Sequence, residues 1–344
     1  MDFSVNLNPL LVPKSVMAAL HDGIGKSLAY PDIKQREVRR KIAEADGVYF
    51  ENVYAGAGAS EMLMAVTAMR RPKCAVLMDP CFSGYAHALR SQADCRTIRL
   101  TLASGNGFLP DLDFVRTALT PALDEGADIL YLADPMNPTG RLIPDGIIDE
   151  ILEIAARTDT AVILDESFRT LSEKVLVPFD VQAGQLRDRI MRYSNLFVIR
   201  SYTKSFGLPG IRMGYLIASS DPISRIADYL PEWNLSVPAG KAMEAIASVC
   251  RDGTFLRNSY ALIQKERLFL AEALHDLGFT VLPSDTCYLL FRGREGLYEA
   301  LLRRGIMIRD CSDYRGLSGG YYRIAVKTHA ENAELIRLLG EVLH

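Results

Sequence analysis

The segment RSYTKSFGLPGIRMGYL, residues 200–216, decides how the rest of the chain is interpreted. It connects two apolar runs, LFVIR (196–200) and MGYLIA (213–218), whose composition is typical of buried strands. Between them lie a lysine, Lys204, several hydroxyl groups and an arginine, Arg212. A guanidinium that enters an apolar strand needs an anion as its partner. The segment therefore raises the question of which anion a cationic, hydroxyl-rich connection between two strands would hold.

Outward from this segment, short apolar runs alternate with stretches of helical periodicity. Strands are predicted at 74–79, 127–134, 160–166, 195–201 and 212–218, and a helix at 143–158. Continuous apolar strands that are separated by helices indicate a mostly parallel sheet with helices on both faces. The predicted fold class is therefore α/β, with a large domain built on such a sheet.

The last third of the chain has a different pattern. A long helical stretch at 237–276 leads into an expected strand pair at 279–292, two further short strands and a helix at 329–343. This order predicts a smaller α+β domain. We expect three parts: residues 1–30 as an N-terminal arm that packs with the small domain, 31–245 as the large cofactor-binding domain, and 246–344 as the small domain.

Composition excludes several classes of function. The chain has 344 residues, 49% of them hydrophobic and 24% charged, with a net charge of −3, which gives no reason to expect a nucleic-acid or membrane partner. No apolar run approaches the roughly 18 residues of a membrane span. The six cysteines and five histidines form no ligand-spaced cluster. We expect a cytoplasmic enzyme without a metal site.

Polar residues follow several predicted strands, at the sheet edge where ligands of open α/β sheets bind. They include Asn137 in DPMNPTG and Asp165 in DES, besides the segment around Lys204. GAGASE (56–61) precedes a helix and would present free backbone N–H groups to an anion. Each feature alone has a plainer interpretation as a turn, a helix cap or a surface lysine.

Together, these features fit pyridoxal 5′-phosphate. This cofactor needs a lysine amine for its aldehyde, a carboxylate at its pyridine nitrogen, a donor near its phenolic oxygen and a cradle for its phosphate. We predict that Lys204 supplies the amine, Asp165 the carboxylate and Asn137 the donor. The residues predicted to seat the phosphate are Gly58, Ala59, Ser60, Ser201, Thr203 and Arg212.

The motifs NPTG, DES, SYTKSFGLPGIRMGY and YYRIAV occur in an order that resembles the fold-type I class I/II aminotransferases, which are pyridoxal-phosphate enzymes. The resemblance covers nearly the whole chain. It implies that Phe82 stacks on the pyridine ring and that Tyr30 reaches the phosphate of a neighbouring subunit's cofactor, which requires a homodimer with shared active sites. It also implies that Arg323 holds the substrate's anionic group and that Asn8 approaches the substrate. Phe82 as a core residue, Tyr30 as a surface aromatic and Asn8 as a turn former remain the alternatives.

Two more charged residues have competing interpretations. Arg309 stands in a short apolar strand, as Arg323 does, and is predicted to bind the substrate's anion with it. The alternative is a structural ion pair with Asp310 or Asp313. Glu166 is predicted to be structural, because Asp165 already occupies the position beside the ring nitrogen.

Within the family, the chain is similar to threonine-phosphate decarboxylases of cobalamin synthesis and to histidinol-phosphate aminotransferases. The opening DFSVNLNPL, the segment 306–336 and Phe168, where the aminotransferases usually have tyrosine, favour the decarboxylases. The resemblance implies conversion of L-threonine O-3-phosphate into (R)-1-amino-2-propanol O-2-phosphate and CO2. Serine phosphate as the substrate, an aminotransferase with 2-oxoglutarate as acceptor, and a cofactor-binding protein without catalysis remain the alternatives.

Overall fold

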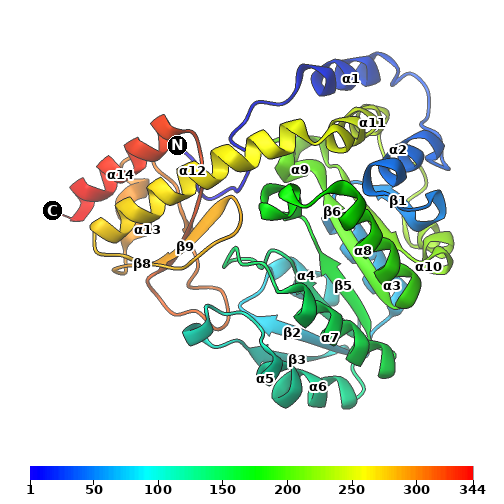
Figure 1. The fold of residues 1–344 in the computed structure, drawn as a ribbon, viewed down its shortest axis with the longest axis horizontal. Coiled ribbons are helices and arrows are strands. Elements are labelled where there is room, and N and C mark those ends of the chain that lie inside the picture. The colour runs from blue at the N-terminus through cyan, green and yellow to red at the C-terminus, as the bar shows by residue number, and fades with distance from the viewer. Residues whose placement is uncertain (344) are drawn as a thin grey trace.

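The structure is a computed structural model that describes residues 1–343, and it contains two sheets (Figure 1). The larger sheet has seven strands in the order β1-β7-β6-β5-β4-β2-β3. Every neighbouring pair is parallel except the two that involve β7. The strands are β1 (Val53–Gly56), β2 (Cys74–Asp79), β3 (Arg96–Thr101), β4 (Ile129–Ala133), β5 (Ala161–Asp165), β6 (Leu196–Ser201) and β7 (Gly214–Ala218).

Helices cover both faces of this sheet, as the sequence predicts. They are α2 (Arg36–Asp46), α3 (Ala59–Arg70), α4 (Ser83–Leu89), α5 (Leu112–Phe114), α6 (Thr120–Asp124), α7 (Asp145–Arg157), α8 (Phe179–Arg192), α9 (Tyr202–Ser205), α10 (Ser220–Arg225) and α11 (Val237–Asp252). Successive strand residues face opposite sides, so Val76 belongs to the core that includes residues of α7, α8 and α11, whereas Leu77 belongs to the core that includes residues of α3 and α4. Two apolar cores therefore enclose the sheet.

The smaller unit is built on a four-stranded antiparallel sheet in the order β10-β11-β9-β8. Its strands are β8 (Thr280–Val281), β9 (Tyr288–Arg292), β10 (Arg309–Asp310) and β11 (Tyr321–Ala325), and its helices are α12 (Thr254–Asp276), α13 (Leu297–Leu302) and α14 (His329–Leu343). The long helix α12 runs between the two units (Figure 1). The continuous helical stretch predicted at 237–276 is two helices, because Gly253 between them adopts a left-handed φ of 74°.

The N-terminal arm packs against both units, which corrects the expectation that all of it packs with the small one. Phe3 donates its N–H to Met307 and accepts from Ala325, and its side chain is buried in the small core. Helix α1 (Lys14–Gly25) instead packs on α11, because Val16 and Leu20 belong to the large core. Figure 1 shows α1 beside α11 and the N-terminus beside α14.

No helix within residues 1–343 has the length and apolar character needed to cross a bilayer.

Candidate active site

The predicted phosphate-binding segments meet at one edge of the large sheet. In the strand registers, Gly214 lies opposite both Ser201 and Gly56, so the carboxyl ends of β6 and β1 flank the start of β7. A Cβ at Gly214 would lie 2.5 Å from the backbone nitrogen of Ala59. The absence of a side chain at Gly214 therefore allows the turn before α3 to approach the strand.

A cavity of about 410 Å³ opens at this edge and extends to the small unit. The predicted residues that line it are Ala59, Ser60, Phe82, Asn137, Asp165, Ser201, Thr203, Lys204, Arg212, Arg309 and Arg323. These residues come from strand ends, helix starts and loops of both units. The fold thus brings together most of the residues that the sequence predicts for one site.

Lys204 lies in α9, directly after β6, and its side chain is partly buried. Burial lowers the pKa of Lys204, and the positive charges of Arg323 and Arg212 lower it further. A larger fraction of the amine is then neutral near pH 7, which is the form that reacts with an aldehyde. The surroundings of Lys204 therefore suit a nucleophilic role.

Asp165 ends β5 and is held by two donors. The Tyr85 hydroxyl donates to its Oδ2 at 2.9 Å, and the backbone N–H of Ser167 donates to its Oδ1 at 3.0 Å. Burial raises the pKa of Asp165, and these two hydrogen bonds act in the opposite direction. A positive group beside this carboxylate would favour its ionised form. A protonated pyridine nitrogen is such a group.

The predicted phosphate cradle has the required donors. A Cβ at Gly58 would lie 2.7 Å from Nη2 of Arg212, so this turn, with φ of 94°, also depends on glycine to admit the guanidinium. The first N–H groups of α3 have no acceptor within the helix. The hydroxyls of Ser201 and Thr203 lie on the same wall and donate to the carbonyl of Met213 at 3.1 and 3.3 Å. Each has a single proton and would have to rotate away from this carbonyl to donate to a phosphate. This donor set fits a phosphate.

Asn137 and Arg323 join the two units across the cavity. Nη1 of Arg323 donates to Oδ1 of Asn137 at 2.6 Å, and Nη2 donates to the carbonyl of Ser4 at 3.2 Å. Because arginine can only donate, the contact leaves the amide N–H groups of Asn137 as donors. Free amide N–H groups are what the role predicted for Asn137, near a phenolic oxygen, would require.

Arg309 lines the cavity and also has a carboxylate partner. Its Nη2 donates to both oxygens of Asp313, at 2.8 and 2.7 Å. The ion pair that the sequence left as the plainer alternative is therefore present. The pair does not remove Arg309 from the cavity wall.

Three predicted residues are not on the cavity wall: Gly58, which adjoins it through Arg212, and Asn8 and Tyr30, which lie away from it. The side-chain amide of Asn8 donates to the carbonyl of Ser205 and to Oγ of Ser259, which gives Asn8 a structural position. The arm residue on the cavity wall is Asn6, whose buried Oδ1 has no hydrogen-bond partner among the described residues. Asn6 therefore replaces Asn8 as the candidate from the arm. Tyr30 is exposed and packs against Trp233 in a tilted arrangement, with ring centroids 4.8 Å apart.

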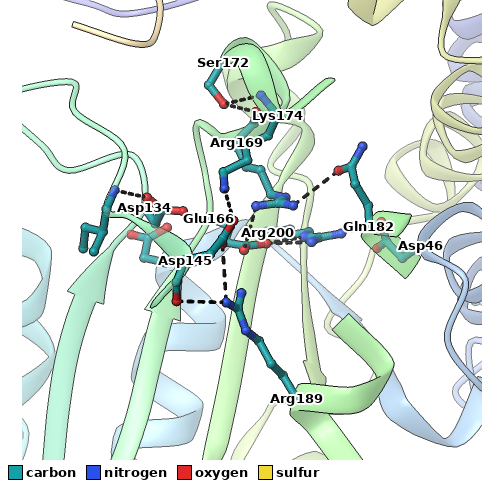
Figure 2. Close-up of polar contacts among 12 residues, drawn as sticks. Asp46, Asp134, Asp145, Glu166, Arg169, Ser172, Lys174, Gln182, Arg189 and Arg200 are labelled. Carbon is teal, nitrogen blue, oxygen red and sulfur yellow. Dashed lines mark hydrogen bonds and ion pairs between the residues drawn. The ribbon is translucent and has the colours of Figure 1, made fainter. Parts of the chain in front are cut away.

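Behind Asp165 and Ser201 lies a buried network of ion pairs. Figure 2 shows Glu166 between Arg169 and Arg200, with Asp46 on the far side of Arg200. Nη2 of Arg200 lies 2.6 Å from Glu166, and its Nη1 lies 2.6 Å from Asp46. Burial opposes the charge of Glu166, but the two arginines outweigh it and lower the pKa of this carboxyl. The network supports the prediction that Glu166 is structural.

Sequence reasoning missed several residues of the wall, among them Asn6, Tyr85, Ser167 and Tyr314. Tyr85, in α4, lies three residues after Phe82, which directly precedes that helix. Ser167 lies two residues after Asp165, where a backbone N–H commonly donates to an aspartate. Tyr314 lies within the segment 306–336, but only the fold shows that its loop reaches the cavity.

Comparisons with known proteins agree with this geometry. The family model described as "Aminotransferase class I and II" matches residues 1–339. The chain belongs to this family. A threonine-phosphate decarboxylase of Salmonella typhimurium is 32% identical over 100% of this chain and 91% of its own length. The histidinol-phosphate aminotransferase structure from Clostridium acetobutylicum is 26% identical, with a TM-score of 0.87 over 100% of this chain and 99% of that one.

The cofactor of this aminotransferase family member is pyridoxal 5′-phosphate. A histidinol-phosphate aminotransferase from Sinorhizobium meliloti, solved in complex with pyridoxal-5′-phosphate, shares the fold with a TM-score of 0.84 at 20% identity, over 99% of this chain and 90% of that one. The amine of Lys204, the buried carboxylate of Asp165 and the cradle around Gly58 fit the aldehyde, the ring nitrogen and the phosphate.

Proposed function

We propose that this aminotransferase family member decarboxylates L-threonine O-3-phosphate to (R)-1-amino-2-propanol O-2-phosphate and CO2. The observation that carries the proposal is the pair Arg309 and Arg323, which lie directly opposite each other in β10 and β11 and line the cavity that holds Lys204. Two guanidinium groups on one wall suit a substrate with a phosphate, because each can form two parallel hydrogen bonds to it.

Bound pyridoxal phosphate would supply an electron sink for the electron pair that is released when a bond at the substrate's Cα breaks. Lys204 would hold the cofactor through its amine before the substrate enters. Asp165, supported by Tyr85, would keep the ring nitrogen protonated. Asn137 would donate to the phenolic oxygen. The cofactor's phosphate would be bound by the residues predicted from the sequence, namely Gly58, Ala59, Ser60, Ser201, Thr203 and Arg212.

The arginines would then set the orientation of the substrate. The bond at Cα that breaks is the one that stands perpendicular to the cofactor ring, because only that bond overlaps the π-system. A phosphate that is anchored away from Cα provides binding energy for this alignment. The carboxylate must be held more loosely than the phosphate, since it leaves as neutral CO2. Asn6 is a further candidate contact in place of Asn8.

Phe168 supports a decarboxylase over an aminotransferase. It lies on the cavity wall, where the resembling aminotransferases have tyrosine, and it cannot donate a hydrogen bond. The full-length similarity to the Salmonella decarboxylase agrees with this choice. The similarity to the Clostridium structure supports the second candidate, a histidinol-phosphate aminotransferase.

We also propose a homodimer in which Tyr30 of each subunit contacts the phosphate of the partner's cofactor. The chain would divide into an arm at 1–30, a large domain at 31–245 and a small domain at 246–344. Tyr30 lies away from the cavity of its own chain and is exposed, as a contribution to a neighbouring site requires.

Replacing Arg323 tests the anion clamp. We expect Arg323→Ala to lower kcat/KM for threonine phosphate by well over tenfold, because anchoring the phosphate also orients the reacting bond. Arg292→Ala, in the neighbouring strand β9 and outside the cavity wall, is the matched control. Turnover should be assayed with threonine phosphate, serine phosphate, histidinol phosphate and unphosphorylated threonine. A preference for histidinol phosphate would overturn the proposal.

A further inference from the structure

The two arginines of the cavity form a like-charged pair across two strands. Arg309 and Arg323 are direct partners in the register of β10 and β11. Like charges that lie directly opposite each other in an antiparallel pair destabilise it. The surroundings of the two guanidinium groups must therefore offset this repulsion, and they do so in different ways.

Arg323 is surrounded by neutral acceptors. Its contacts are the side-chain oxygen of Asn137, the carbonyl of Ser4 and the hydroxyl of Tyr314, at 2.6, 3.2 and 3.5 Å. Its buried Nε has no hydrogen-bond partner among the described residues. The positive charge of Arg323 is thus solvated by dipoles and has no carboxylate partner in the described part of the chain.

Arg309, by contrast, has a carboxylate. Both oxygens of Asp313 contact the same Nη2 of Arg309. The side chains of Arg309 and Asp313 are 35% and 62% exposed, so the pair is reached by solvent and is worth little to stability. The guanidinium also lies over the ring of Tyr314, 5.3 Å from its centroid.

The loop that carries Asp313 is held in place by its own hydrogen bonds and by contact with the large unit. It connects β10 to β11, and the N–H groups of Tyr314 and Leu317 donate to carbonyls within the loop. A Cβ at Gly316 would lie 3.5 Å from the backbone of Asp79 in the large unit, so the loop lies against β2. Asp313 is therefore held where it contacts Arg309, and among the described residues it forms no hydrogen bond with Arg323.

We propose that Asp313 is a resident counterion of Arg309, which an incoming anionic group must displace, and that it thereby favours a phosphate ester over a carboxylate. The inference rests on the proposed function, because it concerns the anion site of the same substrate. A phosphate dianion carries twice the charge of the Asp313 carboxylate and has enough oxygens to accept from both arginines. A carboxylate ligand offers only what Asp313 already provides. Competition with Asp313 therefore weakens the binding of monoanions more than the binding of dianions.

Binding of inorganic phosphate to the holoenzyme tests this role without turnover. The cofactor fills its own phosphate cradle, so calorimetry at pH 8 reports the substrate's anion site. We expect Asp313→Asn and Asp313→Ser to bind phosphate about threefold to fivefold more tightly, since they free Arg309 from an exposed pair. The affinity for acetate should increase by a larger factor than the affinity for phosphate. The ratio of the two affinities should therefore be smaller in these variants than in the wild type.

Asp310→Asn is the matched control, because it removes one negative charge at the end of β10, three residues before Asp313, without freeing Arg309. The carboxylate of Asp310 accepts from the N–H of Ser312. The increase in phosphate affinity caused by Asp313→Asn should also disappear when Arg309 is replaced by methionine (Arg309→Met). Unchanged or weaker phosphate binding in both Asp313 variants, an equal gain in Asp310→Asn, or no phosphate binding in any variant would overturn the inference. None of these readouts depends on which reaction the enzyme catalyses.

Discussion

Among the single residues of the site, Lys204 allows the simplest chemical test. We expect the purified protein to absorb visible light through a cofactor attached to Lys204, and borohydride to fix the cofactor there. Lys204→Ala should lose the reducible adduct, whereas Lys241→Ala, a lysine of α11 that pairs with Glu244, should retain it. Mass spectrometry of the reduced protein is the measurement. An adduct in Lys204→Ala at the wild-type yield would contradict the assignment.

Asp165 should matter more for chemistry than for binding of the cofactor. Asp165→Asn leaves a neutral group beside the ring nitrogen, so we expect turnover to fall roughly a hundredfold while the Kd for pyridoxal phosphate changes much less. Tyr85→Phe removes one hydrogen bond to Asp165 but retains its charge, and should cost about tenfold or less. Steady-state kinetics and cofactor titration measure both variants. Near-wild-type turnover in Asp165→Asn would refute the role.

At the scale of single residues, the sequence was sufficient to predict the site residues at the strand ends. It did not show which residue of the N-terminal arm faces the cavity. Lys204, Asp165 and Arg212 carry groups that a pyridoxal-phosphate site requires, and their order along the chain points to one sheet edge. Asn6 and Asn8 have the same side chain and lie two residues apart. Only the path of the arm over α9 decides which of them faces the cavity.

At the scale of elements, the ion pairs behind β5 and β6 fix the strands that carry the site. The N–H of Glu166 donates to Ile199, and its carboxylate pairs with Arg200, so backbone and side chain join the two strand ends. Arg200→Met would leave the buried Glu166, and also Asp46, without this partner. We expect a loss of about 3–5 kcal/mol in the free energy of unfolding. Arg40→Met, which breaks exposed pairs on α2, should cost less than about 1 kcal/mol.

The effect of Arg200→Met should depend on pH. Because the folded protein lowers the pKa of Glu166 below its ordinary 4.5, ionised Glu166 stabilises the fold above that pH and loses this contribution as pH falls through its folded pKa. The difference between wild type and Arg200→Met should therefore be full at pH 7 and shrink below pH 4.5. Urea unfolding at both values is the measurement. A difference that stays constant with pH would show that Glu166 is not the group left unpaired.

In the large sheet, the strands that sequence patterns predicted are the central ones, because both of their faces are buried and their apolar runs are continuous. β1 has only four residues, and β3 is an edge strand with the pattern RTIRLT, in which exposed polar residues interrupt the run. Neither gives a strong signal, so both were missed. The break between α11 and α12 depends on the conformation of Gly253, which helical periodicity does not report.

For the whole molecule, the exposed apolar residues of the N-terminal region suggest a homodimer. Leu11, Leu28 and Tyr30 are 91%, 102% and 81% exposed. If Tyr30 completes the partner's site, a mixture of Lys204→Ala and Tyr30→Ala subunits should contain hybrids with one intact site. After exchange, we expect roughly a quarter of the wild-type activity from two nearly inactive parents. Light scattering should give a dimer. A fully active monomer, or no recovery in the mixture, would remove Tyr30 from the site.

The central claim is that the bond broken at Cα leads to CO2 and not to amine transfer. The most direct measurement is the state of the cofactor during turnover of threonine phosphate, followed by absorbance in the absence of any keto acid while CO2 is collected. A decarboxylase should release CO2 over many turnovers, with the cofactor returning to its aldehyde form each time. Accumulation of the cofactor as its amine after one turnover, with recovery only on addition of 2-oxoglutarate, would show an aminotransferase and contradict the account.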